Sequence, residues 1–168
     1  MASYDDGKEY VVAWIKEHFP KGSTCLDVGA CDGKWSRLIG DWLVMDAVEV
    51  WRPYIEENDL KSQYRFVYEC DIRQLNYEYY DLIIFGDVLE HLSSDDAKQE
   101  LDYAVTRCKD LVIGVPFLYH QDMINGNPYE KHIQDDLTPE LFNKRFPGFK
   151  AICFPRRDYA YYSKESPL

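Results

Sequence analysis

The chain alternates between two hydrophobic patterns, one typical of helices and one typical of buried strands. Helical spacing of apolar residues and helix-start residues predict helices at 8–19, 34–41, 52–60, 93–108 and 138–145. Short apolar runs predict seven strands, at 24–29, 46–50, 64–70, 80–86, 111–116, 149–154 and 159–163. Residues 117–137 show neither pattern, and we expect them to form a long irregular segment.

The order of these elements predicts the architecture. The run at 80–86 is apolar throughout its centre, as a strand covered on both faces must be. Strands that alternate with helices predict a parallel sheet with helices on both faces. The last two strands are joined by too short a link for a parallel crossover, so the last strand is expected to run antiparallel. We therefore predict a three-layer α/β fold with a mostly parallel seven-stranded sheet, which binds ligands beyond the carboxyl ends of its strands.

Length and composition favour one folded domain spanning residues 1–168. The chain is 46% hydrophobic and 15% aromatic, and it contains no repeat or linker. No apolar run approaches the roughly 20 residues of a membrane span, and the N-terminus does not resemble a signal peptide. Five cysteines without a C-x-x-C pair argue against a disulfide framework and a zinc site, and they predict a cytoplasmic protein.

The net charge of −11 argues against nucleic acid as a partner. Proteins that bind nucleic-acid backbones usually present a basic face, because counterion release supplies much of their affinity. One local exception is the segment 144–168, in which six basic residues stand against two acidic ones. Two interpretations stay open for it, a solvated surface and a patch that faces an anion or a partner.

The segment 26–33, with the sequence LDVGACDG, combines a strand end, a glycine-bounded loop and a helix start. Gly29 allows a sharp turn and close approach of a ligand, and Gly33 lets a helix begin nearby with free N–H groups. A dinucleotide fingerprint starting at Gly29 needs two further glycines, where the chain has cysteine and lysine. A tight turn without any ligand is the alternative.

This segment resembles motif I of the class I S-adenosylmethionine (SAM)-dependent methyltransferases. Asp27, Gly29 and Gly33 match that motif, and Cys31 stands where the middle glycine is usual. Twenty residues beyond Gly29, Glu49 ends a predicted strand, where a carboxylate can accept hydrogen bonds from both ribose hydroxyls. A dehydrogenase could place an acid here as well. The resemblance implies the ribose role for this residue, and a place beside the adenine for Val50 and Trp51.

Two later segments extend the resemblance. Asp71 and Ile72 follow the third strand, where the family places an acceptor for the adenine amino group and an apolar cover for the ring; Asp71 could equally be a turn residue. Residues 87–92, DVLEHL, resemble motif IV of small-molecule methyltransferases, which implies that Asp87 and Val88 line the methionine end of the cofactor. Glu90 and His91 in this segment fit either a structural or a catalytic role.

Together the motifs imply a three-layer Rossmann-like methyltransferase fold that binds SAM and releases S-adenosylhomocysteine. The cofactor-binding residues implied by the resemblance are Asp27, Gly29, Ala30, Cys31, Gly33, Glu49, Val50, Trp51, Asp71, Ile72, Asp87 and Val88. A binding module that holds SAM without transferring a methyl group stays open as an alternative.

The acceptor side is predicted from chemistry. Methyl transfer requires alignment of the acceptor and removal of its proton. The irregular segment follows the fifth strand, where this fold builds its acceptor side, and it contains His132 and His120. We take His132 as the first candidate base and His120 as the second, although either fits a loop histidine with structural hydrogen bonds. The expected acceptor is an O or N atom of a small molecule, with a sugar or glycan precursor as one candidate; protein or RNA is the alternative.

A metal ion is not expected from the sequence. Asp87, Asp122 and Asn125 resemble the metal site of catechol-type methyltransferases, and oxygen ligands of this kind suit magnesium. The adjacent Asp-Asn pair of that family is missing from this chain. The sequence does not indicate an oligomeric state.

Overall fold

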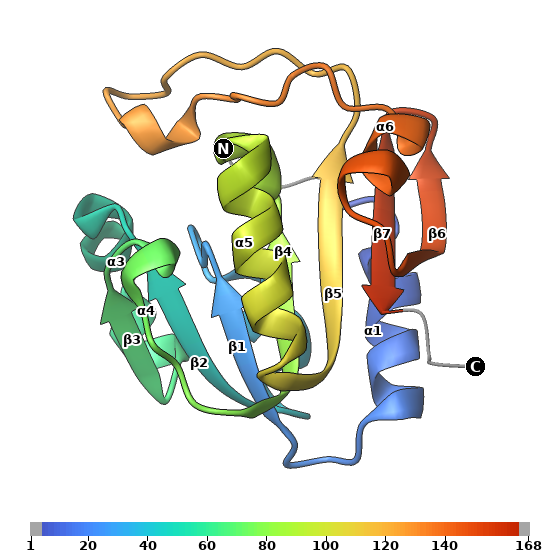
Figure 1. Cartoon of the computed structure of the whole chain (residues 1–168). Coiled ribbons are helices and arrows are strands. Elements are labelled where there is room, and N and C mark those ends of the chain that lie inside the picture. The colour runs from blue at the N-terminus through green and yellow to red at the C-terminus, as the bar shows by residue number, and fades with distance from the viewer. Residues whose placement is uncertain (1–4, 165–168) are drawn as a thin grey trace.

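In the computed structural model, which describes residues 5–164, seven strands form one sheet (Figure 1). They are β1 (Thr24–Val28), β2 (Val44–Glu49), β3 (Phe66–Glu69), β4 (Tyr80–Gly86), β5 (Cys108–Pro116), β6 (Phe149–Arg156) and β7 (Tyr159–Lys164). The strand order is β3-β2-β1-β4-β5-β7-β6. Neighbouring strands are parallel except at β7, which is antiparallel to both β5 and β6. The predicted sheet, including its antiparallel last strand, is confirmed.

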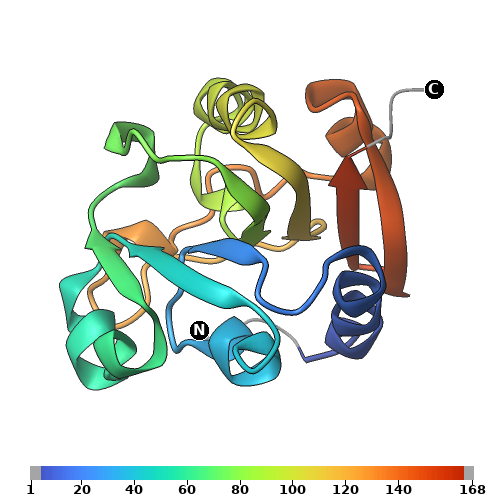
Figure 2. The same ribbon diagram turned by 90° about the horizontal axis from the view of Figure 1, so that it is seen from below.

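Helices cover both faces of the sheet, which Figure 2 shows from below. The helices are α1 (Lys8–His18), α2 (Lys34–Ile39), α3 (Arg52–Glu57), α4 (Leu60–Gln63), α5 (Ser94–Val105) and α6 (Pro139–Arg145). Helices α1 to α4 lie on one face, and α5 and α6 on the other. Three single 3-10 turns complete the described secondary structure, η1 (Ile72–Gln74), η2 (Leu89–His91) and η3 (Pro128–Glu130).

The sheet separates two hydrophobic cores, and β4 contributes to both. Leu82 and Ile84 pack with residues of α1 to α4, whereas Ile83 and Phe85 pack with residues of α5 and α6. Successive strand residues point to opposite faces, so a strand covered on both sides needs apolar residues at every position. This requirement explains the continuous apolar run that identified β4 in the sequence.

Two helices differ from the prediction for local reasons. The helix predicted at 52–60 is divided into α3 and α4, because Asp59 adopts a left-handed φ of 47° between them. The helix predicted at 93–108 ends at Val105, because Cys108 already belongs to β5. Its start agrees with the prediction, since the Ser93 hydroxyl caps α5 by accepting a hydrogen bond from the Asp96 N–H.

The strand order reverses between β1 and β4, which are neighbours in the centre of the sheet. From β1 the chain proceeds to β2 and β3 on one side, and from β4 it proceeds to β5 on the other. A crevice opens at such a reversal point, at the carboxyl ends of the strands. Figure 1 shows the irregular segment 117–137, coloured yellow to orange, crossing above these ends.

The structure bears on three expectations from composition, which concern the basic C-terminal residues, the cysteines and a membrane span. The C-terminal basic residues are partly neutralised, because Arg145 pairs with Asp136 at 2.7 Å and Arg156 pairs with Asp158 at 2.9 Å. The cysteines, all within the described part of the chain, are free thiols. Within residues 5–164, every helix is too short or too polar to cross a membrane.

Candidate functional site

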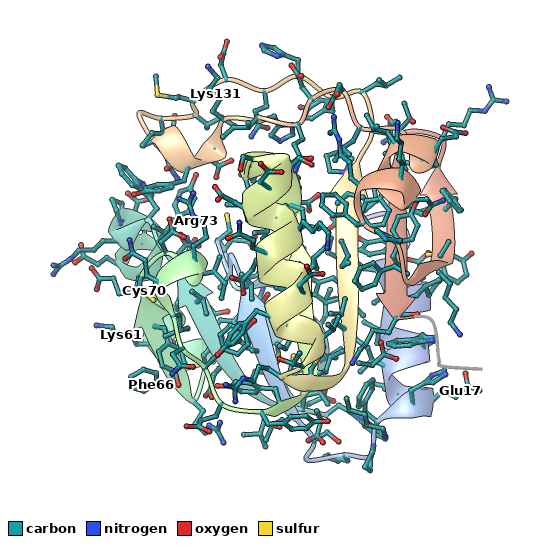
Figure 3. The ribbon with its side chains drawn as sticks, in the orientation of Figure 1. Glu17, Lys61, Phe66, Cys70, Arg73 and Lys131 are labelled. Atoms are coloured by element: carbon teal, nitrogen blue, oxygen red, sulfur yellow. The ribbon has the colours of Figure 1, made fainter. Side chains whose placement is uncertain are left out.

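A cavity of about 210 Å³ lies at the carboxyl ends of β1, β2 and β4, beneath the 117–137 segment. Its walls come from the loop after β1, the ends of β2 and β4, the turns η1 and η2, and the overlying segment. This is the position that the strand order predicts for a ligand site. Figure 3 shows Lys131 on the overlying segment, and below that segment it shows Cys70 and Arg73, which line the cavity.

The loop after β1 turns through three left-handed residues, with φ of 72° at Gly29, 49° at Cys31 and 74° at Gly33. A Cβ atom on Gly29 would lie 2.8 Å from Cγ2 of Val88, so only glycine fits where this loop meets the end of β4. Cys31 adopts the left-handed conformation that glycine adopts most easily, at a cost of roughly 1–2 kcal/mol for a residue with a side chain. The substitution of the usual middle glycine therefore preserves a left-handed turn.

Glu49 anchors this loop from the end of β2. Its Oε2 atom accepts a hydrogen bond from the Cys31 N–H at 2.9 Å, and its Oε1 atom accepts one from the Trp51 N–H at 2.7 Å. The side chain is 5% exposed, and this burial raises the pKa of the Glu49 carboxyl. A carboxylate offers about four acceptor positions, so the Glu49 carboxylate retains acceptor capacity beyond its backbone contacts.

Asp27 lies beneath the loop and is 1% exposed. It is absent from the residues that line the cavity, and its Oδ2 atom accepts a hydrogen bond from the Tyr64 hydroxyl at 2.5 Å. Burial raises the pKa of Asp27 to about 7. The structure therefore places this acid under the loop that forms the wall.

Two more of the predicted residues also lie outside the cavity lining. Gly33 serves as the N-cap of α2, where an added Cβ would meet Oε1 of Gln63. Trp51 supports Glu49 through its backbone, and its ring lies 6.3 Å from the ring of Tyr129, centroid to centroid. The cavity lining includes the other nine residues of the predicted cofactor set, Gly29, Ala30, Cys31, Glu49, Val50, Asp71, Ile72, Asp87 and Val88.

Asp71 combines the two roles considered for it. It lines the cavity, and its side chain caps η1 by accepting a hydrogen bond from the Arg73 N–H at 3.0 Å. The Arg73 guanidinium also pairs with this carboxylate at 2.5 Å, and that contact lowers the pKa of Asp71. Ile72 follows it on the wall and is 6% exposed.

A buried lysine that the sequence analysis did not single out lies behind Asp87. Lys8 is 3% exposed, and its Nζ atom donates to the Tyr161 hydroxyl at 3.2 Å and lies 5.2 Å from the centroid of the Trp35 ring. Burial lowers the pKa of Lys8 to about 8, against the opposing effect of the Asp87 charge. Asp87 itself has a left-handed φ of 57° at the end of β4.

The 117–137 segment is fastened across the cavity by hydrogen bonds. The Tyr54 hydroxyl of α3 donates to Oε1 of Glu130 at 2.8 Å. Gln121 donates from Nε2 to the backbone oxygen of Glu130 at 2.6 Å, which joins the two limbs of the segment. Tyr54, Gln121 and Glu130 all line the cavity. They are contributed by a helix and a long irregular stretch, and the motifs that predicted the cofactor-binding residues do not include them.

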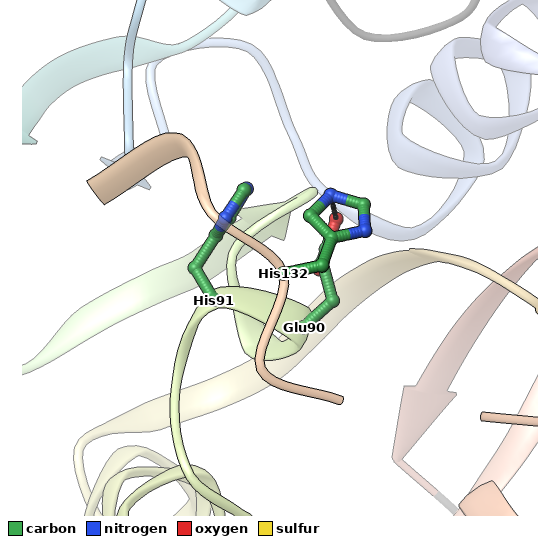
Figure 4. Close-up of side chains that lie close together, drawn as sticks. All are labelled: Glu90, His91 and His132. Carbon is green, nitrogen blue, oxygen red and sulfur yellow. Dashed lines mark ion pairs between the residues drawn. The ribbon is translucent and has the colours of Figure 1, made fainter. Parts of the chain in front are cut away.

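Three residues gather where η2 meets this segment, as Figure 4 shows. The ring centroids of His91 and His132 are 4.8 Å apart, and His132 Nε2 lies 4.0 Å from Oε1 of Glu90. Burial lowers the pKa of both imidazoles, to about 4 for His91, and raises the pKa of the Glu90 carboxyl well above its usual range. All three residues line the cavity, and we call them the Glu90–His91–His132 cluster.

The two candidate bases from the sequence analysis are separated by the structure. His132 is buried in the cavity wall, and its Nδ1 atom contacts the backbone oxygen of Tyr119 at 2.7 Å. His120 has a 66% exposed side chain outside the lining, and its hydrogen bond with Asp135 at 2.8 Å raises the pKa of its imidazole. Asp122 and Asn125, which were compared with a metal site, also lie outside the cavity lining.

Acidic side chains outnumber basic ones along the cavity wall. The acids are Asp32, Glu49, Asp71, Asp87, Glu90 and Glu130, and the bases other than histidine are Lys34 and Arg73. Both bases are already paired with carboxylates, Lys34 with Asp5 at 2.8 Å and Arg73 with Asp71 at 2.5 Å. Burial raises the pKa of Glu49 and Glu90, and Asp71 is paired with Arg73, so the negative charge is smaller than the count of acids. Because both lining bases are engaged by carboxylates, the wall is still less suited to phosphate groups than to a ligand with positive charge.

No protein-family model matches the sequence, and no curated protein matches it. Solved structures with similar folds are numerous. An S-adenosylmethionine-dependent methyltransferase from Clostridium acetobutylicum ATCC 824 superposes with a TM-score of 0.71 at 13% identity, over 96% of this chain and 91% of the other. The magnesium protoporphyrin IX methyltransferase from Synechocystis PCC 6803 with bound SAM superposes with a TM-score of 0.61 at 18% identity, over 92% of this chain and 76% of the other.

The N-terminal domain of EvdMO1, solved in the presence of S-adenosylhomocysteine and D-fucose, superposes with a TM-score of 0.70 at 10% identity, over 99% of this chain and 85% of the other. Identities this low show the fold and leave the chemistry open. The chain therefore has the fold of the SAM-dependent methyltransferases, as the motifs imply.

Proposed function

We propose that this chain binds SAM in the cavity and transfers its methyl group to an O or N atom of a small molecule. The observation that carries the proposal is the acidic balance of a cavity placed where this fold binds a nucleoside. SAM carries a sulfonium and an ammonium group, whereas a dinucleotide carries a pyrophosphate that the same carboxylates would repel.

The residues of the wall fit the parts of such a ligand. Glu49 retains acceptor positions for the ribose hydroxyls, and the apolar side chains of Val50 and Ile72 suit the adenine ring. Asp71 is the acceptor that the resemblance assigns to the adenine amino group. Gly29 leaves the space that a side chain would fill, and Asp87 and Val88 stand at the end of β4 for the methionine portion.

When bound, the cofactor supplies an activated methyl group on a sulfonium sulfur. The chain must then align the acceptor and remove its proton. His132 is the better placed of the two candidate bases, because its Nδ1 atom is held by the Tyr119 oxygen and Nε2 is left for the acceptor. His120 remains the second candidate, on the outer surface of the segment.

A small acceptor suits the way the segment is fastened. The Tyr54–Glu130 hydrogen bond joins α3 to the segment across the cavity, and such a cover admits a small molecule more readily than a folded macromolecule. Sugars are the first acceptors to test, a choice supported by the EvdMO1 structure that was solved in the presence of D-fucose. Nucleic acid is not expected, given the acidic cavity and the ion pairs of the C-terminal basic residues.

The first experiment is calorimetric titration with SAM, S-adenosylhomocysteine and NAD. We expect one equivalent of either sulfur nucleoside to bind and NAD to give no heat. Glu49→Gln should weaken SAM binding at least about tenfold, since hydrogen bonds to charged groups contribute about 1.5–3 kcal/mol. Glu69 pairs with Glu49 in the strand register but is exposed, so Glu69→Gln is the matched control. Binding of NAD without SAM would overturn the proposal.

Turnover is tested by release of S-adenosylhomocysteine with a panel of sugars, other alcohols and amines. His132→Ala should retain SAM binding and lose turnover, whereas His120→Ala should retain both. SAM binding without turnover on any acceptor class would favour the alternative of a module that binds the cofactor without catalysis.

We also propose a cytoplasmic location, supported by the free thiols. Five cysteines that all remain unpaired are typical of a reducing compartment. Fractionation of the source cells with an antibody to the chain would test this, and recovery in an oxidising compartment would contradict it.

A further inference from the structure

We propose that Glu90, His91 and His132 bind a divalent transition-metal ion at the acceptor end of the cavity. Each residue offers one ligand atom, and these atoms lie within 4.8 Å of one another. Figure 4 shows the three side chains converging from two chain segments, with Glu90 and His91 on η2 and His132 on the overlying segment. These ligands differ from the Asp122 and Asn125 pattern that the sequence suggested and discounted.

The hydrogen bonds of the two imidazoles fix each ring in the tautomer that can bind a metal through Nε2. His132 Nδ1 lies 2.7 Å from the backbone oxygen of Tyr119, and His91 Nδ1 lies 3.1 Å from that of Lys131. A carbonyl oxygen only accepts, so in each ring Nδ1 must carry the hydrogen. In a neutral ring the lone pair is then on Nε2. Metal-binding histidines usually have this arrangement, with the second nitrogen donating to a carbonyl or carboxylate.

Glu90 supplies the negative charge. Its side chain is 1% exposed, and neither carboxylate oxygen receives a hydrogen bond from another of the residues that the structure describes. A buried carboxylate without such partners is unfavourable unless it is neutralised, paired or bound to a metal. Its nearest histidine nitrogen, His132 Nε2, lies 4.0 Å away, too far for a hydrogen bond. An ion between these side chains satisfies the carboxylate and both lone pairs.

The backbone holds the two halves of the cluster together. The Glu90 carbonyl oxygen accepts from the N–H groups of Ile133, at 2.8 Å, and Gln134, at 3.0 Å. Gln134 also donates from Nε2 to the backbone oxygen of Leu89 at 2.8 Å. The residues that flank His132 are therefore fastened directly to η2. This attachment explains why ligands about 40 positions apart in the sequence meet in one place.

The donor set indicates which ions fit. Two imidazoles and one carboxylate suit Zn²⁺, Co²⁺ or Fe²⁺, whereas Mg²⁺ prefers oxygen ligands. Bond lengths near 2.1 Å bring neighbouring ligand atoms to about 3 Å, so ligand atoms that now lie 4.0 to 4.8 Å apart must approach by about 1–2 Å on binding. Three protein ligands leave coordination positions open towards the cavity.

Those open positions define the acceptor, a step that rests on the proposed methyl transfer. An ion at this cluster takes acceptors with an oxygen donor beside the reacting atom, such as a vicinal diol or a hydroxy acid. It holds the hydroxyl oxygen and lowers the hydroxyl pKa, as metals do for bound water. The Nε2 lone pair of His132 is then a ligand and cannot also take the proton, so the metal-bound hydroxyl loses its proton to water. Its oxygen forms the new bond to the methyl carbon as the bond from that carbon to the sulfonium sulfur breaks.

Metal binding is tested on the full chain without cofactor or acceptor, so it does not depend on methyl transfer. Metal-free protein is titrated with Co²⁺, followed by visible absorption, and with Zn²⁺, followed by calorimetry. We expect one ion per chain, and Mg²⁺ in equal amount should not displace it. The informative variant is His18→Gln/His120→Gln, which removes both exposed histidines and leaves the cluster intact. It should bind Co²⁺ with the spectrum and affinity of the wild type.

His91→Ala should weaken Co²⁺ binding at least about tenfold, with Glu90→Gln as a second ligand variant; unfolding of either is checked by circular dichroism. The proposal is overturned if the wild type binds no ion, or if binding is lost in the double variant. SAM titration of the same samples separates the two proposals. SAM binding without Co²⁺ binding refutes the metal site alone, and Co²⁺ binding without SAM binding refutes only the proposed function.

Discussion

The backbone N–H of Cys31 donates to Oε2 of Glu49 at 2.9 Å, so the loop after β1 is held by the acid at the end of β2. Cys31 has a left-handed backbone conformation, with φ of 49°, and that conformation directs its N–H to the Glu49 carboxylate. The residue that departs from the usual glycine pattern is therefore part of the support of the proposed ribose-binding acid.

Cys31→Gly is expected to keep the site and the fold. Glycine adopts this conformation without strain, which raises the free energy of unfolding by roughly 1–2 kcal/mol. Its greater freedom in the unfolded chain lowers the same quantity by about 0.5–1 kcal/mol. The melting temperature should rise slightly or stay unchanged, and SAM affinity should persist. Cys31→Val should lower the melting temperature, because a β-branched residue is strongly disfavoured at positive φ. A Cys31→Gly variant without affinity would mean that the thiol contacts the ligand.

Glu49→Gln should reduce stability as well as binding. Both carboxylate oxygens accept backbone N–H groups, and an amide nitrogen in place of one oxygen cannot accept. We expect a loss of about 1–3 kcal/mol in the free energy of unfolding, measured in urea without ligand. Glu69→Gln should change it by less than about 0.5 kcal/mol, as is usual for exposed positions. Equal losses in the two variants would contradict the anchoring role.

Gly29→Ala should destabilise the fold by about 1–3 kcal/mol more than Gly22→Ala. Both glycines have positive φ, 72° and 91°, but an added Cβ meets Val88 Cγ2 at 2.8 Å only at position 29, since nothing lies within 4 Å at position 22. The double variant Gly29→Ala/Val88→Ala should recover part of the difference. Independent, additive effects in this cycle would show that the contact is not responsible.

Asp27 should make the stability of the ligand-free protein fall as pH rises from about 4 to about 7, against the opposite contribution of His91 and His132, whose lowered pKa values make stability rise with pH. The pKa of Asp27 is about 7 in the folded chain against an ordinary 3.8, because of burial. In this window Asp27 binds more protons in the folded state than in the unfolded state, so its deprotonation favours unfolding, and above about pH 7 the effect is complete. A difference of about three pKa units corresponds to about 4 kcal/mol.

Asp27→Asn should flatten this pH dependence, measured by urea unfolding at a series of pH values. Tyr64→Phe provides the matched variant, because the Tyr64 hydroxyl donates to the ionised carboxylate and opposes the pKa rise. Loss of that hydroxyl should move the window to higher pH. An unchanged slope in Asp27→Asn would assign the pH dependence to other buried acids.

The proposed cofactor half of the site follows from local sequence patterns. Gly29, Glu49, Asp71 and Asp87 each end or follow a short apolar strand within a few residues. Once these strands are predicted to be parallel, their carboxyl ends must share one edge of the sheet, and the side chains come together there. The separation of α3 from α4 at Asp59 was missed, because no spacing rule marks a left-handed aspartate.

The acceptor half depends on contacts that no periodicity indicates. His132 reaches the cavity because the adjacent backbone bonds to Glu90, and His120 is left outside by its pairing with Asp135. Both are histidines of one irregular segment, and although His132 was taken as the first candidate base, no sequence pattern showed that it alone of the two lines the cavity. Tyr54 was read as part of a helix, and its bond to Glu130 became evident only in three dimensions.

The central pairing of β1 with β4 has a consequence for how the molecule folds. Thr24 donates its backbone N–H to Asp81 across 57 positions of sequence, at the edge opposite the cavity. Pairings between such distant segments form slowly, because loop closure must precede them. The cavity therefore exists only in chains that have completed this central pairing. A ligand that fills it selects the completed fold, and above its dissociation constant each tenfold rise in its concentration adds about 1.4 kcal/mol to stability.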